Sequence, residues 1–464
     1  MSSELQLPNG WTWETIDSIK AQGRSIVSGP FGSNIGKRFF VEHGVPVIRG
    51  NNLSLGMERF NDEGFVFLTE DKAAEFANCE AHPDDLIFTA AGTIGQVGII
   101  PRTSKFPKYI ISNKQLRARL DAKKVRPLFA YYWLASPPMV ATIQNRNTGS
   151  TIPLINLSVL KSLTVPIPPL GVQDSIVSIL SCLDDRIALL RETNATLESI
   201  AQALFKSWFV DFDPVHARAR GEQTPGLAPE VAALFPESFE ESELGMVPKG
   251  WSWSVLGNVC TDHGGTIQTG PFGSQLHASD YVQEGTPVVM PKDISGRRVD
   301  GGTAARIGMA DVERLSRHQL QIGDIVFSRR GDVEKHALIG ELEQGWLCGT
   351  GCLLVRPGKN WCSPGFLSRL LDLQSTKRWL TQHAVGATMP NLNTGILAAV
   401  PVLLPSREVL IEFEQLTHVL DTRISENNAT IQTLSNLRDT LLPRLISGQL
   451  RLPEAEQQLK DLAV

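Results

Sequence analysis

Several stretches of the sequence carry residue types that enzymes use for chemistry, yet none has the spacing that the chemistry requires. Asp211-Phe-Asp-Pro-Val215 approaches the Asp-Pro-Pro-aromatic motif of amino-methyltransferases, but it lacks the second proline and the ring that stacks on a flipped base. Gly92-Thr-Ile-Gly-Gln-Val-Gly98 has the wrong glycine spacing for a cofactor loop, and no Walker loop for ATP is present. Asp332-Val-Glu-Lys335 lacks the alternating carboxylate–lysine spacing of many nucleases.

The cysteines give no stronger candidate. The six cysteines are scattered, and Cys348, Cys352 and Cys362 lack the spacing and the histidine of a zinc module. Low cysteine use without an export signal favours a reducing, cytoplasmic environment. No stretch approaches the ~18 apolar residues of a membrane span. We therefore expect no catalytic residue, no metal site and no membrane segment in this chain.

The distribution of charge leaves nucleic acid open as a partner. The net charge of −5 over 464 residues argues against nucleic acid by itself. Only the surface that faces DNA must be positive, however, and one basic run contains Asp121 as its only acid. The run comprises Arg102, Lys105, Lys108, Lys114, Arg117, Arg119, Lys123, Lys124 and Arg126. A DNA-facing surface and an ordinary solvated surface are equally good interpretations of it.

The elements that must position such residues occur twice. Six motifs recur in the same order, with offsets between 237 positions (Leu183 to Leu420) and 241 positions (Ser28 to Thr269). The first copies are Leu7-Pro-Asn-Gly-Trp-Thr-Trp13, Ser28-Gly-Pro-Phe-Gly-Ser33, Gly44-Val-Pro-Val-Ile48, Asp85-Leu-Ile-Phe88, Gly149-Ser-Thr-Ile-Pro-Leu-Ile-Asn156 and Leu183-Asp-Asp-Arg-Ile187. The second copies begin at Val247, Thr269, Gly285, Asp324, Gly386 and Leu420. Collinear matches indicate an internal repeat, so the chain is two copies of one unit.

Each copy consists of a globule followed by a long helix. The globule has about 160 residues of short strand-like runs separated by Gly and Pro, with a few helical patches. The helix has apolar positions at alternating steps of four and three, the seam of a coiled coil. The first seam is Ile176, Leu180, Leu183, Ile187, Leu190, Asn194, Leu197, Ala201, Leu204 and Trp208. The second is Phe413, Thr417, Leu420, Ile424, Asn427, Ile431, Leu434, Arg438 and Leu441.

Each seam needs a partner, and the helix of the other copy is the obvious one. Packing of each stripe on its own globule is the alternative. A helix of about 35 residues spans roughly 50 Å at ~1.5 Å per residue. Asn194 and Asn427 lie near the middle of the seams, where a buried pair would fix the register; an exposed step is the other interpretation. Ser406 is a predicted N-cap of the second helix.

The predicted fold is therefore α+β. Two mixed α/β domains are each followed by a long helix, and the helices pair as an antiparallel coiled coil with pseudo-twofold symmetry, since two globules presented outward favour that direction. The expected segments are a first domain (1–165), a first spacer helix (166–212), a linker (213–246), a second domain (247–404), a second spacer helix (405–447) and a tail (448–464).

These motifs resemble, over essentially the full length, the specificity subunits of type I restriction–modification systems. The carrying motifs are Leu7-Pro-Asn-Gly-Trp11, Gly29-Pro-Phe-Gly-Ser33, Gly149-Ser-Thr-Ile-Pro153 with Asn156, Val165-Pro-Ile-Pro168, Ala203-Leu-Phe-Lys-Ser-Trp-Phe-Val-Asp-Phe-Asp-Pro214 and Leu437-Arg-Asp-Thr-Leu-Leu-Pro-Arg-Leu-Ile-Ser-Gly448. Any one alone is weak, but the ordered and largely duplicated set is highly specific. One departure is His216-Ala-Arg218, where the family more often has basic residues directly.

The resemblance implies a target-recognition role for each globule. Each would read one half of a bipartite, asymmetric double-stranded DNA site, and the helices would set the gap. The subunit would be non-catalytic and hold no cofactor. It would bind two methyltransferase subunits and two restriction/translocase subunits, which use S-adenosylmethionine, ATP and Mg for adenine methylation and restriction. Half-sites read from one face should lie about one helical turn, ~34 Å, apart.

Candidate DNA contacts lie in glycine-rich loops and among side chains that read base edges. The loops permit close backbone approach, and a turn kept for folding is the alternative; their candidates are Ser28, Gly29, Phe31, Gly32, Ser33, Gly270, Phe272, Gly273 and Ser274. The polar candidates are Arg49, Asn51, Asn52, Lys114, Gln115, Lys292, Arg329 and Arg330. Singly, each is more readily a solvated surface residue, and as a group we expect some to contact DNA.

Other questions stay open from sequence alone. Residues 149–156 and 386–393 close each globule, and they either touch DNA or pin the junction with the helix. The cluster Phe205, Trp208, Phe209 and Phe212 either caps the coiled coil or docks a methyltransferase subunit. A scaffold that bridges proteins without touching DNA is the alternative function, and sequence-selective DNA binding in the presence of partners discriminates the two.

Overall fold

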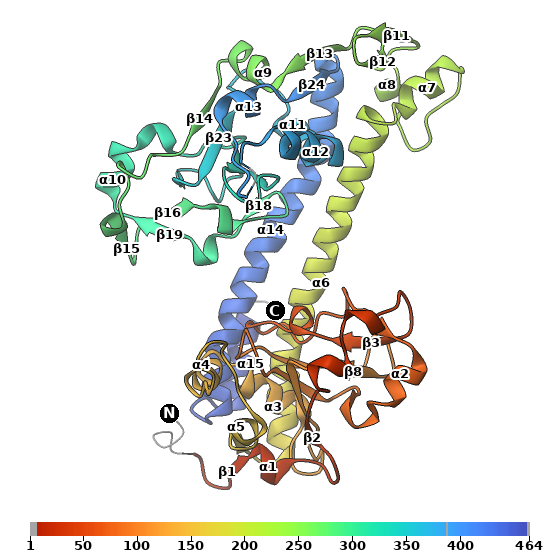
Figure 1. The fold of residues 1–464 in the computed structure, drawn as a ribbon. Coiled ribbons are helices and arrows are strands. Elements are labelled where there is room, and N and C mark those ends of the chain that lie inside the picture. The colour runs from red at the N-terminus through yellow and green to blue at the C-terminus, as the bar shows by residue number, and fades with distance from the viewer. Residues whose placement is uncertain (1–6, 387, 462–464) are drawn as a thin grey trace. The chain divides into compact units, whose positions relative to one another are not determined.

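The computed structural model describes residues 7–386 and 388–461, and the chain divides into two compact units. Unit 1 comprises Met1–Leu190 with Thr430–Val464, and unit 2 comprises Arg191–Ala429. Each unit contains a globule and one segment of each of two long helices, α6 (Leu170–Phe209) and α14 (Arg407–Ile446) (Figure 1). The predicted α+β class with two paired long helices is confirmed.

The globule of unit 1 contains two four-stranded sheets. The first has the order β2, β9, β6, β7, and the second has the order β4, β3, β8, β5. The bounds are β2 (Ile26–Ser28), β9 (Gln115–Ala118), β6 (Leu86–Thr89), β7 (Val97–Ile99), β4 (Val66–Leu68), β3 (Val45–Ile48), β8 (Tyr109–Ile111) and β5 (Glu80–Ala81). The first sheet is antiparallel, and the pair β3–β8 is parallel. A separate pair, β1 (Thr12–Thr15) with β10 (Thr164–Ile167), joins the two ends of the globule.

The first sheet of unit 1 is covered on both faces. Successive residues of a strand point to opposite faces. Leu86 and Phe88 of β6 accordingly pack in a core with α3 (Pro127–Leu134) and α6, whereas Ile87 packs with the second sheet. All four residues of β6 are buried. Double coverage explains why this strand reads as a continuous apolar run rather than an alternating one.

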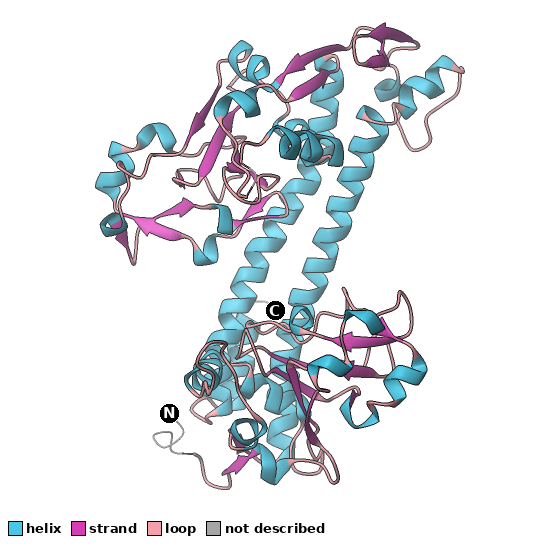
Figure 2. Ribbon diagram, in the orientation of Figure 1, coloured by secondary structure: helices cyan, strands magenta, loops and turns pink. Residues whose placement is uncertain are grey.

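Unit 2 repeats this architecture (Figure 2). Its sheets have the orders β14, β23, β20, β21 and β15, β19, β16, β22. The bounds are β14 (Thr266–Thr269), β23 (Cys352–Arg356), β20 (Ile325–Ser328), β21 (His336–Leu338), β15 (Tyr281–Val282), β19 (Ala305–Ile307), β16 (Thr286–Val289) and β22 (Leu347–Cys348). The pair β13 (Ser252–Val255) with β24 (Pro401–Leu404) corresponds to β1 with β10. The repeat in the sequence is therefore a repeat of the fold.

Short helices complete both globules. Unit 1 also contains α1 (Ile16–Ile19), α2 (Glu70–Ala74), α4 (Pro137–Asn145), α5 (Leu157–Lys161) and α15 (Leu452–Asp461). Unit 2 also contains α7 (Asp213–Ala219), α8 (Pro229–Ala232), β11 (Phe239–Ser242), β12 (Gly245–Pro248), α9 (Leu256–Asp262), β17 (Ile294–Ser295), β18 (Arg298–Val299), α10 (Met309–Arg314), α11 (Pro364–Asp372), α12 (Gln374–His383) and α13 (Thr394–Ala398).

Within each unit, the segment of α6 packs against the segment of α14. In unit 1, Leu183 and Ile187 share a core with Leu434. In unit 2, Asn194 bonds Asn427, whereas Phe205, later on α6, lies beside Phe413, earlier on α14, with ring centroids 5.8 Å apart. Rising numbers on one helix meet falling numbers on the other, so the segments are antiparallel.

The two long helices are anchored by side-chain amides and by a cap. Asn194 Oδ1 accepts a hydrogen bond from Asn427 Nδ2 at 2.7 Å, and its Nδ2 donates to Asn428 Oδ1 at 2.8 Å. These satisfied amides favour a single register. Ser406 Oγ accepts from the Val409 amide at 3.4 Å, which confirms the predicted N-cap. Most of the other predicted seam residues are buried: Ile176, Leu180, Leu183, Ile187, Leu190, Ala201, Trp208, Phe413, Thr417, Ile424, Leu434, Arg438 and Leu441. The half-buried ones are Leu197, Leu204, Leu420 and Ile431.

The aromatic cluster at the end of α6 belongs to the core of unit 2. Phe205, Trp208 and Phe209 are buried, and Phe212 packs partly buried against the same core. Trp208 lies 5.0 Å from Phe235 between ring centroids, in an edge-on arrangement. Of the two interpretations left open by the sequence, packing is the one that agrees with this burial.

Two absences hold for the described residues. No helix among them combines the length and the apolar character that a membrane crossing requires. No three of their histidine, cysteine, aspartate and glutamate side chains gather in a way that would hold a metal ion. Cys348 and Cys352 lie fully buried in an apolar core of unit 2.

Candidate nucleic-acid interface

Four loops of unit 1 meet at one end of its first sheet, and we call them edge 1 (residues 28–33, 89–92, 112–115 and 149–155). The Gly29 amide donates to Gln115 O at 3.0 Å, and the Ala90 amide donates to Lys114 O at 2.7 Å. The Ile155 amide in turn donates to Ala90 O at 2.8 Å. The glycine-rich loop, the β8–β9 turn and the segment that closes the globule are thus one hydrogen-bonded surface.

The same four loops meet in unit 2, and we call them edge 2 (residues 269–274, 328–331, 349–352 and 388–392). The Gly270 amide donates to Cys352 O at 3.0 Å, and the Arg329 amide donates to Gly351 O at 2.9 Å. The Leu392 amide donates to Arg329 O at 2.9 Å. Each of these bonds is the counterpart of one in edge 1, so both units build the edge in the same way.

The first glycine of each glycine-rich loop is required by close packing of backbone. A Cβ on Gly29 would lie 1.8 Å from Ser112 O, and a Cβ on Gly270 would lie 1.9 Å from Gly349 O. The rest of each loop is at the surface: Phe31 is 86% exposed and Phe272 is 55% exposed. The exposed candidates in these loops also include Ser28, Gly32, Ser33, Gly273 and Ser274. The first glycine of each loop is therefore needed for the fold, and the phenylalanine two residues later is exposed to solvent.

An alanine at Gly270 is expected to lower the free energy of unfolding of unit 2 by about 1–3 kcal/mol, because both backbones must move to admit its Cβ. Gly273→Ala, in the same loop, meets no atom within 4 Å and is the matched control. Denaturant unfolding of the two variants measures the difference. Equal stability of the two would show that close backbone packing does not hold this loop.

The polar candidates of unit 1 separate into exposed and buried groups. Lys114 is exposed on the β8–β9 turn. Arg49 and Asn51, in and beside η3 (Gly50–Asn52), both donate to Gly64 O, at 3.3 and 3.2 Å. Asn52 is fully buried, where its amide donates to Asn61 O and Glu63 O and accepts from the Arg49 amide.

Two candidates therefore leave the DNA-facing set. The side-chain amide of Asn52 donates its hydrogen bonds to the segment that follows η3. Gln115 is buried, and its side chain accepts a hydrogen bond from Ser112 Oγ. A side chain without exposed surface does not reach a base edge. The counterpart of Asn52 in unit 2 is Asp293, which accepts from the Met290 amide at 3.0 Å in the same geometry.

The polar candidates of unit 2 lie on the corresponding loops. Lys292 is exposed in η6 (Pro291–Asp293), the counterpart of η3. Arg330 is exposed on edge 2, and its backbone pairs with Asn391. Arg329 is half-buried, and its Nε is enclosed without a hydrogen-bond partner among the described residues.

Most of the basic run of unit 1 is committed to intramolecular contacts. Arg117 is buried and donates to the carbonyl oxygens of Glu80 and Arg24. Carboxylates of the same unit pair with Arg102, Lys105, Lys108, Arg119 and Arg126. The run is therefore not one positive patch, and of its members Lys114 is the one on edge 1.

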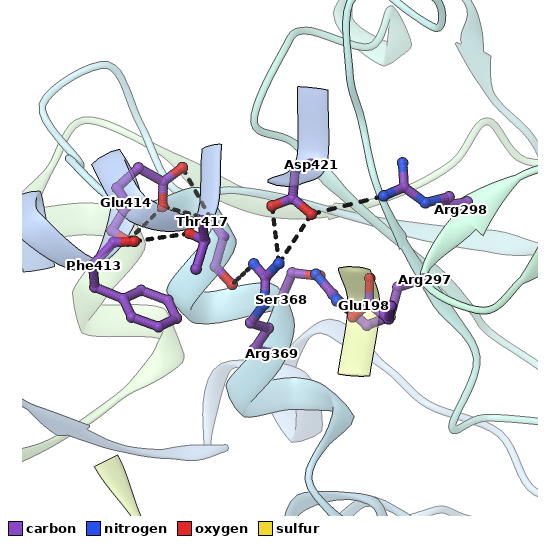
Figure 3. A network of polar contacts seen from close by, with 11 residues as sticks. Glu198, Arg297, Arg298, Ser368, Arg369, Phe413, Glu414, Thr417 and Asp421 are labelled. Carbon is purple, nitrogen blue, oxygen red and sulfur yellow. Dashed lines mark hydrogen bonds and ion pairs between the residues drawn. The ribbon is translucent and has the colours of Figure 1, made fainter. Parts of the chain in front are cut away.

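A buried ion-pair network fixes the globule of unit 2 to its helix segments. Asp421 of α14 accepts from Arg369 Nη2 of α11 at 2.9 and 3.0 Å and lies 3.7 Å from Arg298 (Figure 3). Arg369 has no exposed surface. Arg297 pairs with Glu198 of α6 and donates to Ser368 Oγ at 3.1 Å. Both long-helix segments of this unit are thus tied to the globule.

Unit 1 has a related network around Asp184, the counterpart of Asp421 in the repeated Leu-Asp-x-Arg-Ile motif. Asp184 accepts from Arg438 Nη1 and from the Tyr132 hydroxyl, both at 2.8 Å. Arg59 donates to Tyr132 Oη at 2.9 Å and to Asp185 at 3.1 Å. Burial raises the pKa of Tyr132 well above its ordinary value, so its hydroxyl stays a donor. These positioning residues were not identified from sequence, although an aspartate beside the seam in both copies was an available signal.

The chain is similar in sequence to known proteins. The family described as type I restriction modification DNA specificity domain matches residues 40–199. The type I restriction enzyme HindI specificity subunit of Haemophilus influenzae is 26% identical over 383 residues, which cover 74% of this chain and 81% of that protein. The type I restriction enzyme MjaIX specificity subunit of Methanocaldococcus jannaschii is 24% identical over 376 residues, which cover 80% and 78%.

A solved structure shares the fold. The S subunit of a type I restriction–modification system from M. genitalium is 19% identical and superposes with a TM-score of 0.52, covering 95% of this chain and 98% of that chain.

Proposed function

We propose that this chain, which is similar to type I restriction–modification specificity subunits, supplies the DNA sequence recognition of such an enzyme and carries no catalytic centre of its own. Each unit reads one half of a bipartite, asymmetric site, and the long helices set the gap between the halves. The observation that carries this proposal is the duplicated edge, whose backbone bonds are the same in both units while its lysine and arginine side chains stand at different positions. Unlike half-sites require that combination.

The chain works in a complex with other subunits and DNA. We propose that the complex contains two methyltransferase subunits, which use S-adenosylmethionine, and two restriction/translocase subunits, which use ATP and Mg, and that it acts in the cytoplasm. Residues 1–165 and 247–404 act as recognition domains, 166–212 and 405–447 as spacer helices, 213–246 as the linker and 448–464 as the tail.

The proposed DNA-facing residues are those of the two edges and of the adjoining 3-10 helices. Apart from Gly270, which is buried, their exposed or half-buried positions leave them available to a duplex, with backbone amides suited to phosphate and cations suited to base edges. They are Ser28, Gly29, Phe31, Gly32, Ser33, Arg49, Asn51 and Lys114 in unit 1, and Gly270, Phe272, Gly273, Ser274, Lys292, Arg329 and Arg330 in unit 2.

The test is a map of adenine methylation in the genome of cells that carry this chain with its methyltransferase subunit. We expect a bipartite motif with a fixed unspecified gap, present with the chain, absent after its deletion and restored by complementation. Methylation that is the same with and without the chain, while the reconstituted complex is active, would reject the proposal. A reconstituted complex that binds its partners without any DNA sequence preference would favour a protein-bridging scaffold instead.

A further inference from the structure

The two edges share the features that do not distinguish one half-site from the other. Both have a glycine-rich loop held by the same backbone contact, and both expose a phenylalanine at the same loop position. The shared glycine-rich loop and phenylalanine are expected to make the same DNA contacts in both units. A difference between the half-sites must therefore come from side chains that differ between edge 1 and edge 2. The residues that determine specificity are therefore expected among those side chains.

The edges differ in where they carry positive charge. Within the ranges of edge 1, Lys114 is the only lysine or arginine, and it stands on the turn that leads into β9. Within edge 2, the corresponding turn has Gly351, and the cations are Arg329 and Arg330 at the end of β20. Edge 1 has Ala90 and Ala91 at that place. Neither set of ranges contains an aspartate or a glutamate.

The two cation positions are neighbours across a hydrogen bond. The Ala90 amide donates to Lys114 O in unit 1, and the Arg329 amide donates to Gly351 O in unit 2. The cation thus lies on the β8–β9 turn in edge 1 and on the adjacent loop, after β20, in edge 2. The backbone hydrogen bond between the two loops is the same in both units. Of the two arginines, Arg330 is the exposed one, and its backbone is held by pairing with Asn391.

We propose that Lys114 and Arg330 are specificity-determining residues, each reading a guanine in the half-site of its own unit. Guanine presents two acceptors, N7 and O6, on its major-groove edge, and lysine and arginine are the side chains that commonly donate to them. Because the cations stand on different loops, the guanines occupy different positions within the two half-sites. This inference rests on the proposed function and adds to it the residues and the base that they recognise.

The experiment maps adenine methylation in cells that express the methyltransferase subunit with wild-type chain, Arg330→Ala or Lys114→Ala. Each variant is expected to lose roughly 5- to 150-fold of its discrimination at one guanine of one half-site, the range for a good base contact. The other half-site and the gap stay unchanged. Arg330→Lys, which keeps the charge but loses the planar fork, is expected to give an intermediate loss at the same guanine.

Matched controls lie beyond the far ends of β9 and β23, the strands that begin at edge 1 and edge 2. Lys359 follows β23 and Lys123 follows β9, both exposed and both away from the edges. Lys359→Ala and Lys123→Ala are expected to leave the methylated motif unchanged.

Two results would overturn the inference. One is an unchanged motif in Arg330→Ala and Lys114→Ala with methylation reduced evenly over all sites, as a phosphate contact predicts. The other is a relaxed motif in the control variants. If Arg330→Ala abolishes methylation altogether, Arg330→Lys decides, and full discrimination by that variant counts against the inference. A wild-type chain that directs no bipartite motif instead rejects the proposed function itself.

Discussion

Replacing Asp421 with alanine is expected to lower the free energy of unfolding of unit 2 by about 3–5 kcal/mol, the cost of breaking a buried ion pair from one side. Asp421 accepts two hydrogen bonds from Arg369, whose side chain has no exposed surface, so the variant removes the carboxylate that pairs with a buried guanidinium. Hydrogen exchange of unit 2 peptides in the full chain, or denaturant unfolding followed by circular dichroism, measures the loss.

The control lies two residues away on the same helix. Arg423 pairs with Glu426 at 3.1 Å with both side chains exposed, and Arg423→Ala is expected to cost no more than about 1 kcal/mol. The double variant Asp421→Ala with Arg369→Met removes both charges and is expected to recover most of the lost stability. A large loss in Arg423→Ala, or no loss in Asp421→Ala, would contradict the assignment of this network as the tie between globule and helix.

Trp208→Ala is expected to lower the free energy of unfolding of unit 2 by about 3–5 kcal/mol, the range for truncating a large aromatic side chain in a core. Trp208 is 2% exposed and packs between Phe235 and Phe413, at centroid distances of 5.0 and 5.8 Å. The cavity that alanine leaves cannot close completely because the neighbours are held by the two long-helix segments of the unit. Unfolding by guanidinium, followed by circular dichroism, gives the difference.

Ile200 provides the comparison for Trp208 on the same helix. Its side chain is half exposed, and Ile200→Ala is expected to change stability by no more than about 1 kcal/mol. Normal stability of Trp208→Ala together with failure to bind a methyltransferase subunit would instead identify the aromatic cluster as a docking surface. The two outcomes separate the interpretations that the sequence left open.

The architecture was predictable because repeated motifs and the spacing of apolar residues determine it, and both can be recognised in the sequence. Motifs that recur at nearly constant offset establish the duplication, and the four–three spacing of Leu183, Ile187 and their successors establishes the helices. The register pair Asn194–Asn427 was also visible, since an amide in an apolar seam stands out by type alone. Each of these signals depends on residues close in sequence or on repetition.

The fate of individual polar side chains was not predictable in the same way. Asparagine is a residue type that reads bases, but the sequence around Asn52 does not reveal that its side-chain amide donates to Asn61 O and Glu63 O. The partners Asp184 and Arg438 are 254 positions apart, and only the fold brings them to 2.8 Å. The basic run misleads for the same reason, since its acids come from elsewhere in the chain.

The discontinuity of unit 1 has a consequence for how the chain is made. Unit 2 is one continuous stretch, Arg191–Ala429, whereas unit 1 joins the first residues of the chain to the last. A ribosome therefore releases every residue of unit 2 before it makes Leu434 and Arg438, which complete the core and the ion pair of unit 1. Domains commonly fold in the order of synthesis. Unit 1 is therefore begun first and finished last, and synthesis that stops after residue 429 leaves unit 2 complete and unit 1 without its C-terminal segment.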